Sequence, residues 1–254
     1  MIRPVKSKTC IAMVLGLGAA ATANAQQVET APGGIDVHAH AVEHAPDIFR
    51  SVMIDQLELR HGDDGSPLIL EGEAWIGSDL NKFWIKADID SLDGDVEEFE
   101  LQALYSRAVA PYWDLQMGLR QDIRPDDGRS WAVLGLQGLA PYFFETEAAL
   151  FISKSGGAAM SLSTEYELLL TQQWVLSPEI ELDFYGQNDR ARGTGSGLSD
   201  IQAGIRLRYE VRREFAPYIG INWNRKFGDA AEFAADAGED ASSTQWVAGF
   251  RIWF

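Results

Sequence analysis

Apolar and polar residues alternate along most of the chain between Val52 and Phe254, and this alternation predicts a series of β-strands. In the segment 113–122, every charged residue occupies an even position, while Trp113 and Leu119 occupy odd ones. The same separation of charge from apolar residues holds in the segments 144–152, 162–170, 179–184 and 200–210. Strands with one apolar and one polar face are typical of a membrane β-barrel, where lipid contacts one face and water the other.

Polar breaks divide this region into twelve predicted strands. Long breaks are expected at 61–67, 90–95, 124–129, 153–157, 187–197 and 227–243, and short ones at 77–81, 110–111, 140–141, 176–178 and 213–217. Two loop classes and an even number of strands fit an outer-membrane barrel, with long loops outside and short turns in the periplasm. The predicted fold is therefore all-β, an antiparallel transmembrane barrel of about twelve strands with both ends in the periplasm. The strands at 52–60 and 129–139 alternate poorly.

A soluble β-sandwich would also alternate, but three features favour the barrel. The apolar faces extend over about ten residues, the length that a tilted strand needs to cross a bilayer. Aromatic residues gather at the strand ends, as in an interfacial girdle. The last strand finishes on Phe254, which resembles the signal read by the barrel assembly machinery. Ala-Pro-Tyr recurs at 110–112, 140–142 and 216–218, and we expect each copy at a periplasmic turn, where a proline can start a strand.

The first 25 residues predict a signal peptide that is removed: a basic start, an apolar stretch and Ala23-Asn24-Ala25 as the cleavage site. The domain prediction is a signal peptide at 1–25, a flexible periplasmic arm at 26–50 and an outer-membrane barrel at 51–254. Cys10 lies within the removed segment, so the mature chain has no thiol for disulfides or thiolate chemistry.

The chain carries a formal net charge of −17 at neutral pH. Removal of the basic leader makes the mature chain more acidic still. Such a chain should repel nucleic acid and attract cations. Acidic loops are also common at bacterial surfaces, so charge alone selects no ligand.

All four histidines precede the second strand. Because a Ser-His hydrolase needs a base beside its serine, and only His61 could serve, we expect no enzymatic activity. His38, His40 and His44 cluster in the arm, where imidazoles with nearby carboxylates suit copper(II), nickel or zinc. The alternative is a polar linker with three incidental histidines, because the spacing matches no strong metal motif.

Charged residues of the polar faces should line the lumen. They are Glu145, Glu147, Glu165, Glu167, Glu179, Glu181 and Asp183 on the acidic side, with Arg206, Arg208 and Arg251 on the basic side. Two roles are open to them: a cation-attracting lumen, or structural ion pairs across the interior. We favour the structural role, because buried charges need partners.

Specific blocks of the barrel region resemble the copper resistance protein B family of Gram-negative outer-membrane proteins. They are AWIGSD at 74–79, NKFWIK at 81–86, LYSRAVAPYWD at 104–114, GLAPY at 138–142, GSGLSD at 195–200, RLRYE at 206–210, REFAPY at 213–218 and VAGFRIWF at 247–254. The resemblance implies an outer-membrane barrel that acts in copper tolerance with a periplasmic multicopper oxidase. It implies copper binding at the periplasmic side, or assistance in copper export. A passive cation-selective pore is the alternative.

One departure concerns the ligands. The family often carries a long stretch rich in methionine and histidine ahead of the barrel, whereas this arm has no methionine between Gln26 and Met53. Thioether ligands, which copper(I) prefers, are therefore scarce, and the three arm histidines would favour copper(II).

Overall fold

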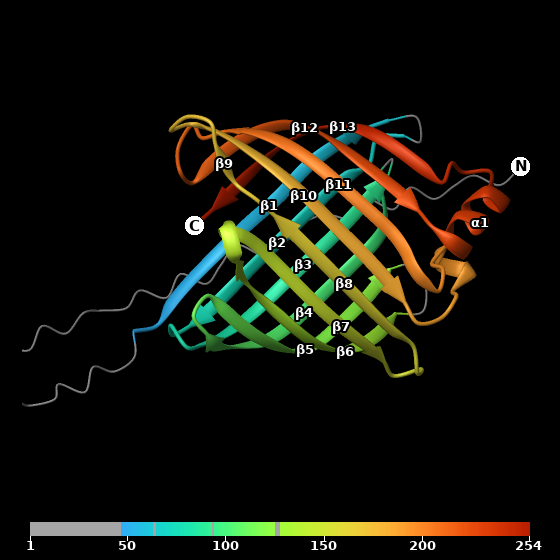
Figure 1. The fold of residues 1–254 in the computed structure, drawn as a ribbon, viewed down its shortest axis with the longest axis horizontal. Helices are drawn as coiled ribbons and strands as arrows, with labels where there is room; N and C mark the ends of the chain where they lie inside the picture. The colour runs from blue at the N-terminus through green and yellow to red at the C-terminus, as the bar shows by residue number, and fades with distance from the viewer. Residues whose placement is uncertain (1–46, 63–64, 93, 125–127) are drawn as a thin grey trace, which may run out of the picture. The chain divides into compact units, whose positions relative to one another are not determined.

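The computed structural model describes residues 47–62, 65–92, 94–124 and 128–254, and it shows a closed antiparallel β-barrel (Figure 1). The predicted signal peptide and most of the predicted arm, with His38, His40 and His44, lie outside the described residues. The strands are β1 (Phe49–His61), β2 (Leu68–Gly77), β3 (Asn81–Leu92), β4 (Asp95–Ala110), β5 (Trp113–Arg124), β6 (Arg129–Ala140), β7 (Phe144–Ser153), β8 (Ala158–Glu165), β9 (Leu168–Leu169), β10 (Trp174–Tyr185), β11 (Gly197–Tyr209), β12 (Phe215–Lys226) and β13 (Ser242–Trp253). Because β8 and β9 both pair with β10, they form one interrupted strand, and the predicted twelve-stranded barrel is confirmed.

The first and last strands close the barrel. β1 pairs with β13, and the backbones of Val52 and Phe254 exchange two hydrogen bonds of 3.1 and 2.8 Å. The connections at 78–80, 111–112, 141–143, 170–173 and 210–214 lie at the same end as these two residues, which we call the turn end. The other connections lie at the loop end, where helix α1 (Gly228–Ala237) is found (Figure 1). In bacterial outer-membrane barrels, short turns face the periplasm and longer loops face outward.

Two predicted connections differ from the structure at the loop end. The long break expected at 90–95 is short, because β3 extends to Leu92 and β4 begins at Asp95. The last loop contains α1, whose alanine-rich sequence favours a helix and ends at Gly238, a residue in the left-handed conformation with φ 80°. The short 3-10 helix η2 (Arg190–Arg192) lies in the β10–β11 loop.

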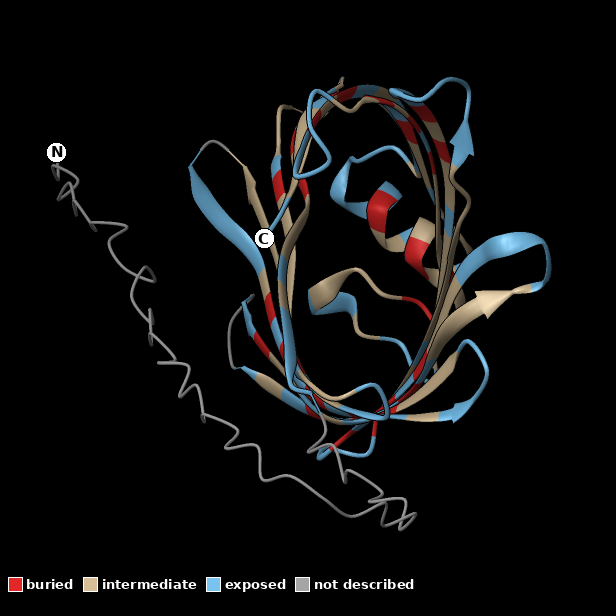
Figure 2. Cartoon of the chain, turned by 90° about the vertical axis from the view of Figure 1, so that its left-hand side faces the viewer, coloured by how far each residue is buried: buried red, intermediate tan, exposed pale blue. Residues whose placement is uncertain are grey.

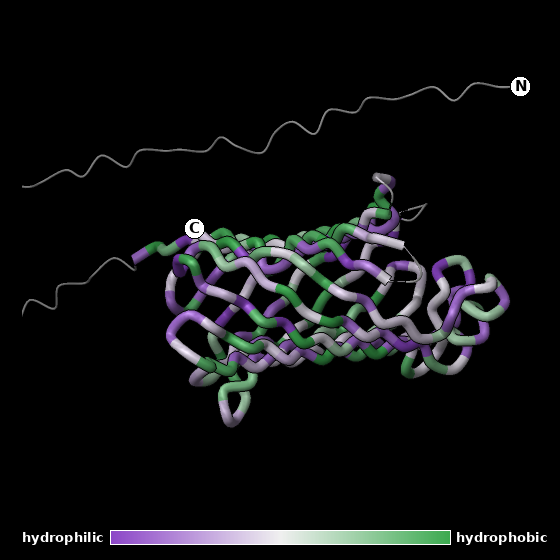
Figure 3. Tube along the Cα trace, turned by 90° about the horizontal axis from the view of Figure 1, so that it is seen from above, coloured by the Kyte–Doolittle hydropathy of each residue, from purple (hydrophilic) through white to green (hydrophobic). Residues whose placement is uncertain are grey.

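Large apolar side chains cover the outer face of the barrel. Hydrophobic and hydrophilic residues alternate along the strands in Figure 3. More than half of the surface is exposed in each of four residues on this face: Leu119, Ile152, Ile205 and Ile219. Contact of so large an apolar surface with water would be unfavourable. Within the described residues, no helix is long and apolar enough to span a membrane. The outer face therefore has the character that lipid contact requires.

Replacing Leu119 with arginine should reduce the stability of the inserted barrel by about 2–4 kcal/mol, because Leu119 lies halfway along β5 on the outer face and would place a charge in hydrocarbon. Unfolding in lipid vesicles measures the change, and Leu119→Met, which keeps the apolar surface, is the control. Equal stability of the two variants would contradict the placement of this face in lipid.

A β-bulge explains the poor alternation of the first strand. Asp55 and Gln56 together oppose the single residue Arg251, because the register shifts between Ile54 and Leu57. Both side chains therefore line the interior, and every later residue of β1 has its parity reversed. A pattern of strict alternation cannot continue across such an insertion.

Pro178 lies within β10 and not at a turn, so the short break predicted at 176–178 is wrong. Its carbonyl accepts a hydrogen bond from the Tyr166 N–H at 3.1 Å, but proline has no N–H to donate in return. The neighbouring strand is interrupted at this place, between β8 and β9. The turn lies instead at 170–173, where the Thr171 hydroxyl accepts hydrogen bonds from two backbone N–H groups.

The Ala-Pro-Tyr repeat has two different roles. Tyr112 and Tyr142 lie in turns at the turn end, each with φ 69°, and both are well exposed. The third copy was expected at a turn and this is wrong: residues 216–218 belong to β12, and Tyr218 is buried inside the barrel. The predicted turn at 213–217 accordingly lies earlier, at 210–214.

Candidate functional site

The interior of the barrel contains a long cavity of about 1350 Å³. Its lining includes Tyr112 and Leu139 near the turn end and Glu97 and Arg192 near the loop end, so the cavity extends over the length of the barrel. Looking along the barrel axis, Figure 2 shows α1 inside the outline of the ring of strands, at the loop end. The lumen is therefore a continuous space whose outer mouth is partly covered.

One side of the lumen is apolar. Trp84, Leu104, Trp131, Val133, Ala149 and Phe151, from β3, β4, β6 and β7, form a buried cluster. Arginines cover it: the Arg120 guanidinium lies 4.9 Å from the Phe151 ring centroid, and that of Arg129 lies 5.2 Å from the Trp131 ring. Because β6 is apolar toward both lipid and lumen, its sequence lacks the alternation of the other strands.

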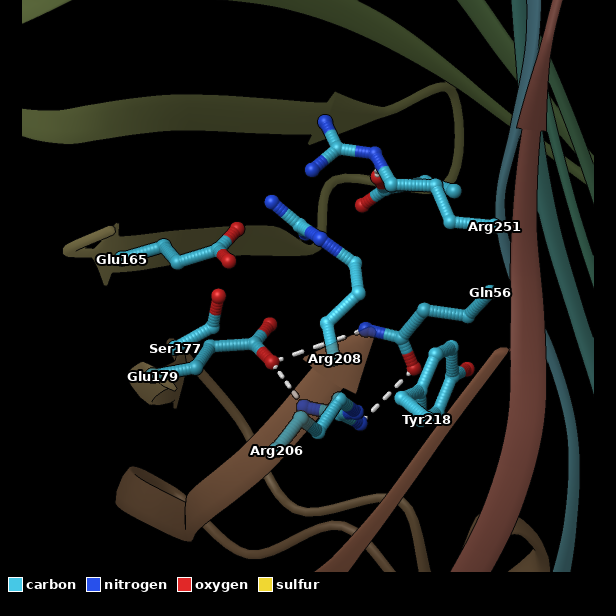
Figure 4. A pocket seen from close by; sticks show the side chains of 9 residues that line it. Gln56, Glu165, Ser177, Glu179, Arg206, Arg208, Tyr218 and Arg251 are labelled. Carbon is cyan, nitrogen blue, oxygen red and sulfur yellow. Dashed lines mark hydrogen bonds and ion pairs between the residues drawn. The ribbon is translucent and has the colours of Figure 1, made fainter. Parts of the chain in front are cut away.

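A buried network fills the side of the lumen formed by β10 to β1, and Figure 4 shows the part of it around Arg206, Glu179 and Gln56. Glu58 is completely buried and accepts hydrogen bonds from Arg206 at 3.0 and 3.1 Å, Arg60 at 2.6 Å and Tyr218 at 3.0 Å. Arg206 also binds Glu179 and donates to the Gln56 amide oxygen at 2.8 Å. Next to this network is a small cavity of about 20 Å³, room for a single water molecule.

Glu167 is the centre of a second group of ion pairs on the same side of the lumen. It lies between β8 and β9 and binds both Arg208 and, at 3.0 Å, Arg251, which also binds Asp55 at 2.7 Å. Burial raises the pKa of the Glu167 carboxyl, but the two guanidiniums outweigh burial and hold this pKa below its ordinary value. Five of the predicted lumen charges, Glu167, Glu179, Arg206, Arg208 and Arg251, thus have ion-pair partners on this side of the lumen.

Several other lumen carboxylates have no cation within 4 Å among the described residues. Of the predicted set, Glu147 binds Lys86 at 2.6 Å, whereas Glu145, Glu165, Glu181 and Asp183 lack such a partner. The structure adds carboxylates that sequence reasoning did not single out: Glu71, Glu73, Asp88, Asp90, Glu98 and Asp200. Each of these carboxylates lies on the polar face of its strand, so its position in the alternation could have identified it as a lumen residue.

Several of these carboxylates are direct neighbours across the sheet. Glu71 pairs with Asp88 on β2–β3, and Glu145 pairs with Glu165 on β7–β8. Like charges directly opposite each other destabilise a sheet. Strands β3 and β10 lie six steps apart in either direction around the ring, so the carboxylates of β2–β3 face those of β10 across the cavity. This arrangement of carboxylates destabilises the folded barrel, but it is suited to attracting cations.

The loop end contains a second ionic network. Asp122 is buried and binds Arg120 at 2.8 Å, Arg192 at 3.3 Å and the Trp131 N–H at 2.8 Å. Asp189, at the base of η2, binds Arg129. The β10–β11 loop is therefore fixed to the inner wall of the barrel.

The described residues contain no group of three or more His, Cys, Asp or Glu side chains arranged to hold a metal ion. The only histidine among them is His61, at the loop end, whose Nδ1 lies 2.9 Å from the Ser66 hydroxyl. The donors that the lumen offers are carboxylate oxygens, which suit hydrated cations more than the soft copper(I) ion.

Comparisons with solved structures show the same architecture. The chain is similar to the KdgM porin, with a TM-score of 0.51 at 12% identity over 80% of this chain and 98% of the porin. It is also similar to the NanC porin, with a TM-score of 0.52 at 11% identity over 80% of this chain and 99% of that porin. At these identities the likeness concerns the fold, an outer-membrane barrel.

Sequence comparisons identify the family. The family described as "Copper resistance protein B precursor (CopB)" matches residues 48–254. Copper resistance protein B of Escherichia coli is 44% identical over 219 residues, 86% of this chain and 74% of the relative. The Copper resistance protein B homolog of Pseudomonas syringae pv. tomato is 39% identical over 251 residues, 99% of this chain and 81% of the relative. This outer-membrane barrel therefore belongs to the copper resistance protein B family.

Proposed function

We propose that this protein contributes to copper resistance by capturing copper at the periplasmic side of the outer membrane and by letting cations pass through its lumen. The observation that supports this proposal is the continuous cavity, whose lining includes carboxylates, such as Glu71, Glu165 and Glu181, that have no cation within 4 Å among the described residues. Such walls raise the local concentration of cations and hold them weakly enough to be released.

The proposal assigns capture of copper(II) to His38, His40 and His44, which precede β1 in the sequence, and it takes these residues to act at the periplasmic side. The proposed partners are copper ions, outer-membrane lipid and, as the family resemblance implies, a periplasmic multicopper oxidase. The barrel assembly machinery would recognise the last strand, which ends at Phe254.

A passive cation-selective pore without a dedicated metal site is the second candidate. It is favoured by the absence of a group that could hold a metal ion within the described parts of the chain. The two candidates differ in the role of the arm, because a passive pore needs no histidine there.

Copper survival of a deletion strain tests the proposal. Wild type should restore growth on copper, whereas the variant with His38, His40 and His44 replaced by alanine should restore less and should bind copper(II) at least about tenfold more weakly in titration. His61→Ala, which changes the remaining histidine, should behave as wild type. Full complementation and unchanged affinity of the triple variant would favour the passive pore, and no phenotype on deletion would refute the proposed contribution to copper resistance.

A further inference from the structure

Part of the β10–β11 loop lies inside the barrel. Ala191, Arg192, Gly193 and Thr194 line the lumen cavity together with residues of the strands. Arg192 is largely buried, with 18% of its side chain exposed, although it belongs to a loop. Its guanidinium binds Asp122 on β5 at 3.3 Å and lies 3.9 Å from Asp189.

The outer side of the same loop is fixed to α1. Arg190 binds Asp236 at 2.6 Å and lies 5.4 Å from the Phe233 ring centroid, and the Asn188 amide donates to Asp229 at 2.7 Å. Gly195 permits this packing, because a Cβ atom there would lie 2.3 Å from the Ala230 nitrogen. The loop is thus held between the helix and the inner wall, across the loop-end mouth.

We propose that this loop forms the constriction at the loop end, and that Arg192 limits the entry of cations there. The inference rests on the cation passage proposed above. A positive charge at the mouth of an acidic lumen opposes cations by Coulomb repulsion, and its ion pair with Asp122 also keeps the loop inside the barrel. Arg192 therefore acts as a specificity-determining residue, whereas Arg190, two positions away with 66% of its side chain exposed, does not face the lumen.

Planar-bilayer conductance of Arg192→Gln against wild type and Arg190→Gln tests this role. Arg192→Gln should raise the cation current at least about twofold at 0.1 M salt, and by less at 1 M salt, where screening shortens the reach of the charge. Arg190→Gln should leave the current unchanged. An increase of the same size in Arg190→Gln would mean that loosening the loop suffices, and it would overturn the role of the Arg192 charge.

A chemical rescue separates charge from folding. Because Cys10 is the only cysteine of the chain and lies in the predicted leader, Arg192→Cys provides a single thiol in the mature protein. A methanethiosulfonate reagent that adds a quaternary ammonium group should lower the raised current again, and a neutral reagent of similar size should lower it less. Equal effects of the two reagents would overturn the proposal. If wild type carries a cation current that Arg192→Gln does not change, only the constriction is refuted; if no variant carries current, the proposed passage is refuted as well.

Discussion

Replacing Glu58 with alanine is expected to lower the free energy of unfolding of the barrel by about 3–5 kcal/mol, the cost of removing one partner from a buried ion pair. Glu58 accepts hydrogen bonds from two arginines and Tyr218, and it has no exposed surface. Its loss leaves Arg206 and Arg60 buried with fewer acceptors, and Arg206 would depend on Glu179 and Gln56 alone.

Denaturant unfolding in lipid vesicles, followed by tryptophan fluorescence, measures this change. Glu239→Ala is the matched control, because Glu239 also forms an ion pair, with Lys226 at 3.3 Å, but 62% of its side chain is exposed. An exposed pair contributes at most about 1 kcal/mol. A loss for Glu58→Ala no larger than for Glu239→Ala would show that the buried network does not stabilise the barrel.

Neutralising four facing lumen carboxylates should abolish most of the cation preference of the lumen. The variant replaces Glu71, Asp88, Glu181 and Asp183 with their amides. Each lines the cavity and has no cation within 4 Å among the described residues, so none of the four is neutralised by an ion pair. The ratio of cation to anion permeability should fall about tenfold or more, since a loss of about 1.4 kcal/mol in electrostatic attraction already gives a factor of ten.

The reversal potential in a salt gradient measures this ratio. A control that neutralises four exposed carboxylates outside the lumen, Glu214, Glu232, Glu239 and Asp240, should retain the cation preference. If the lumen variant and the control have the same reversal potential, the carboxylates of the cavity do not select the ion.

The two kinds of lumen carboxylate have different physical roles. Glu58, Glu167 and Glu179 are held by arginines and contribute to the stability of the fold. Glu71, Asp88 and Glu181 lie near other carboxylates, an arrangement that costs folding energy. Such a cost is typical of functional sites, and it is consistent with the cation passage proposed above.

The alternation of apolar and polar residues determined the fold class, the number of strands and, for most strands, the face that contacts lipid. These features follow from local rules, because the period of a strand is two residues and the bilayer distinguishes its faces. The alternation also indicated that residues such as Glu145 and Glu165 line the lumen. It failed at Asp55 and Gln56, where a bulge reverses the parity, and at Pro178, where a proline lies inside a strand.

Only the tertiary structure decided which charges meet. Arg206 and Glu58 are separated by 148 residues, and Arg192 and Asp122 by 70, so their contacts depend on how the ring closes and how the loop folds inward. The apolar side of the lumen was likewise hidden in the sequence, because Trp131 and Val133 could equally have faced lipid. Closure of the ring brings the side chains of strands that are distant in the sequence into one enclosed space. For this reason the tertiary structure, and not the local pattern, decided which charges form ion pairs and which loop enters the lumen.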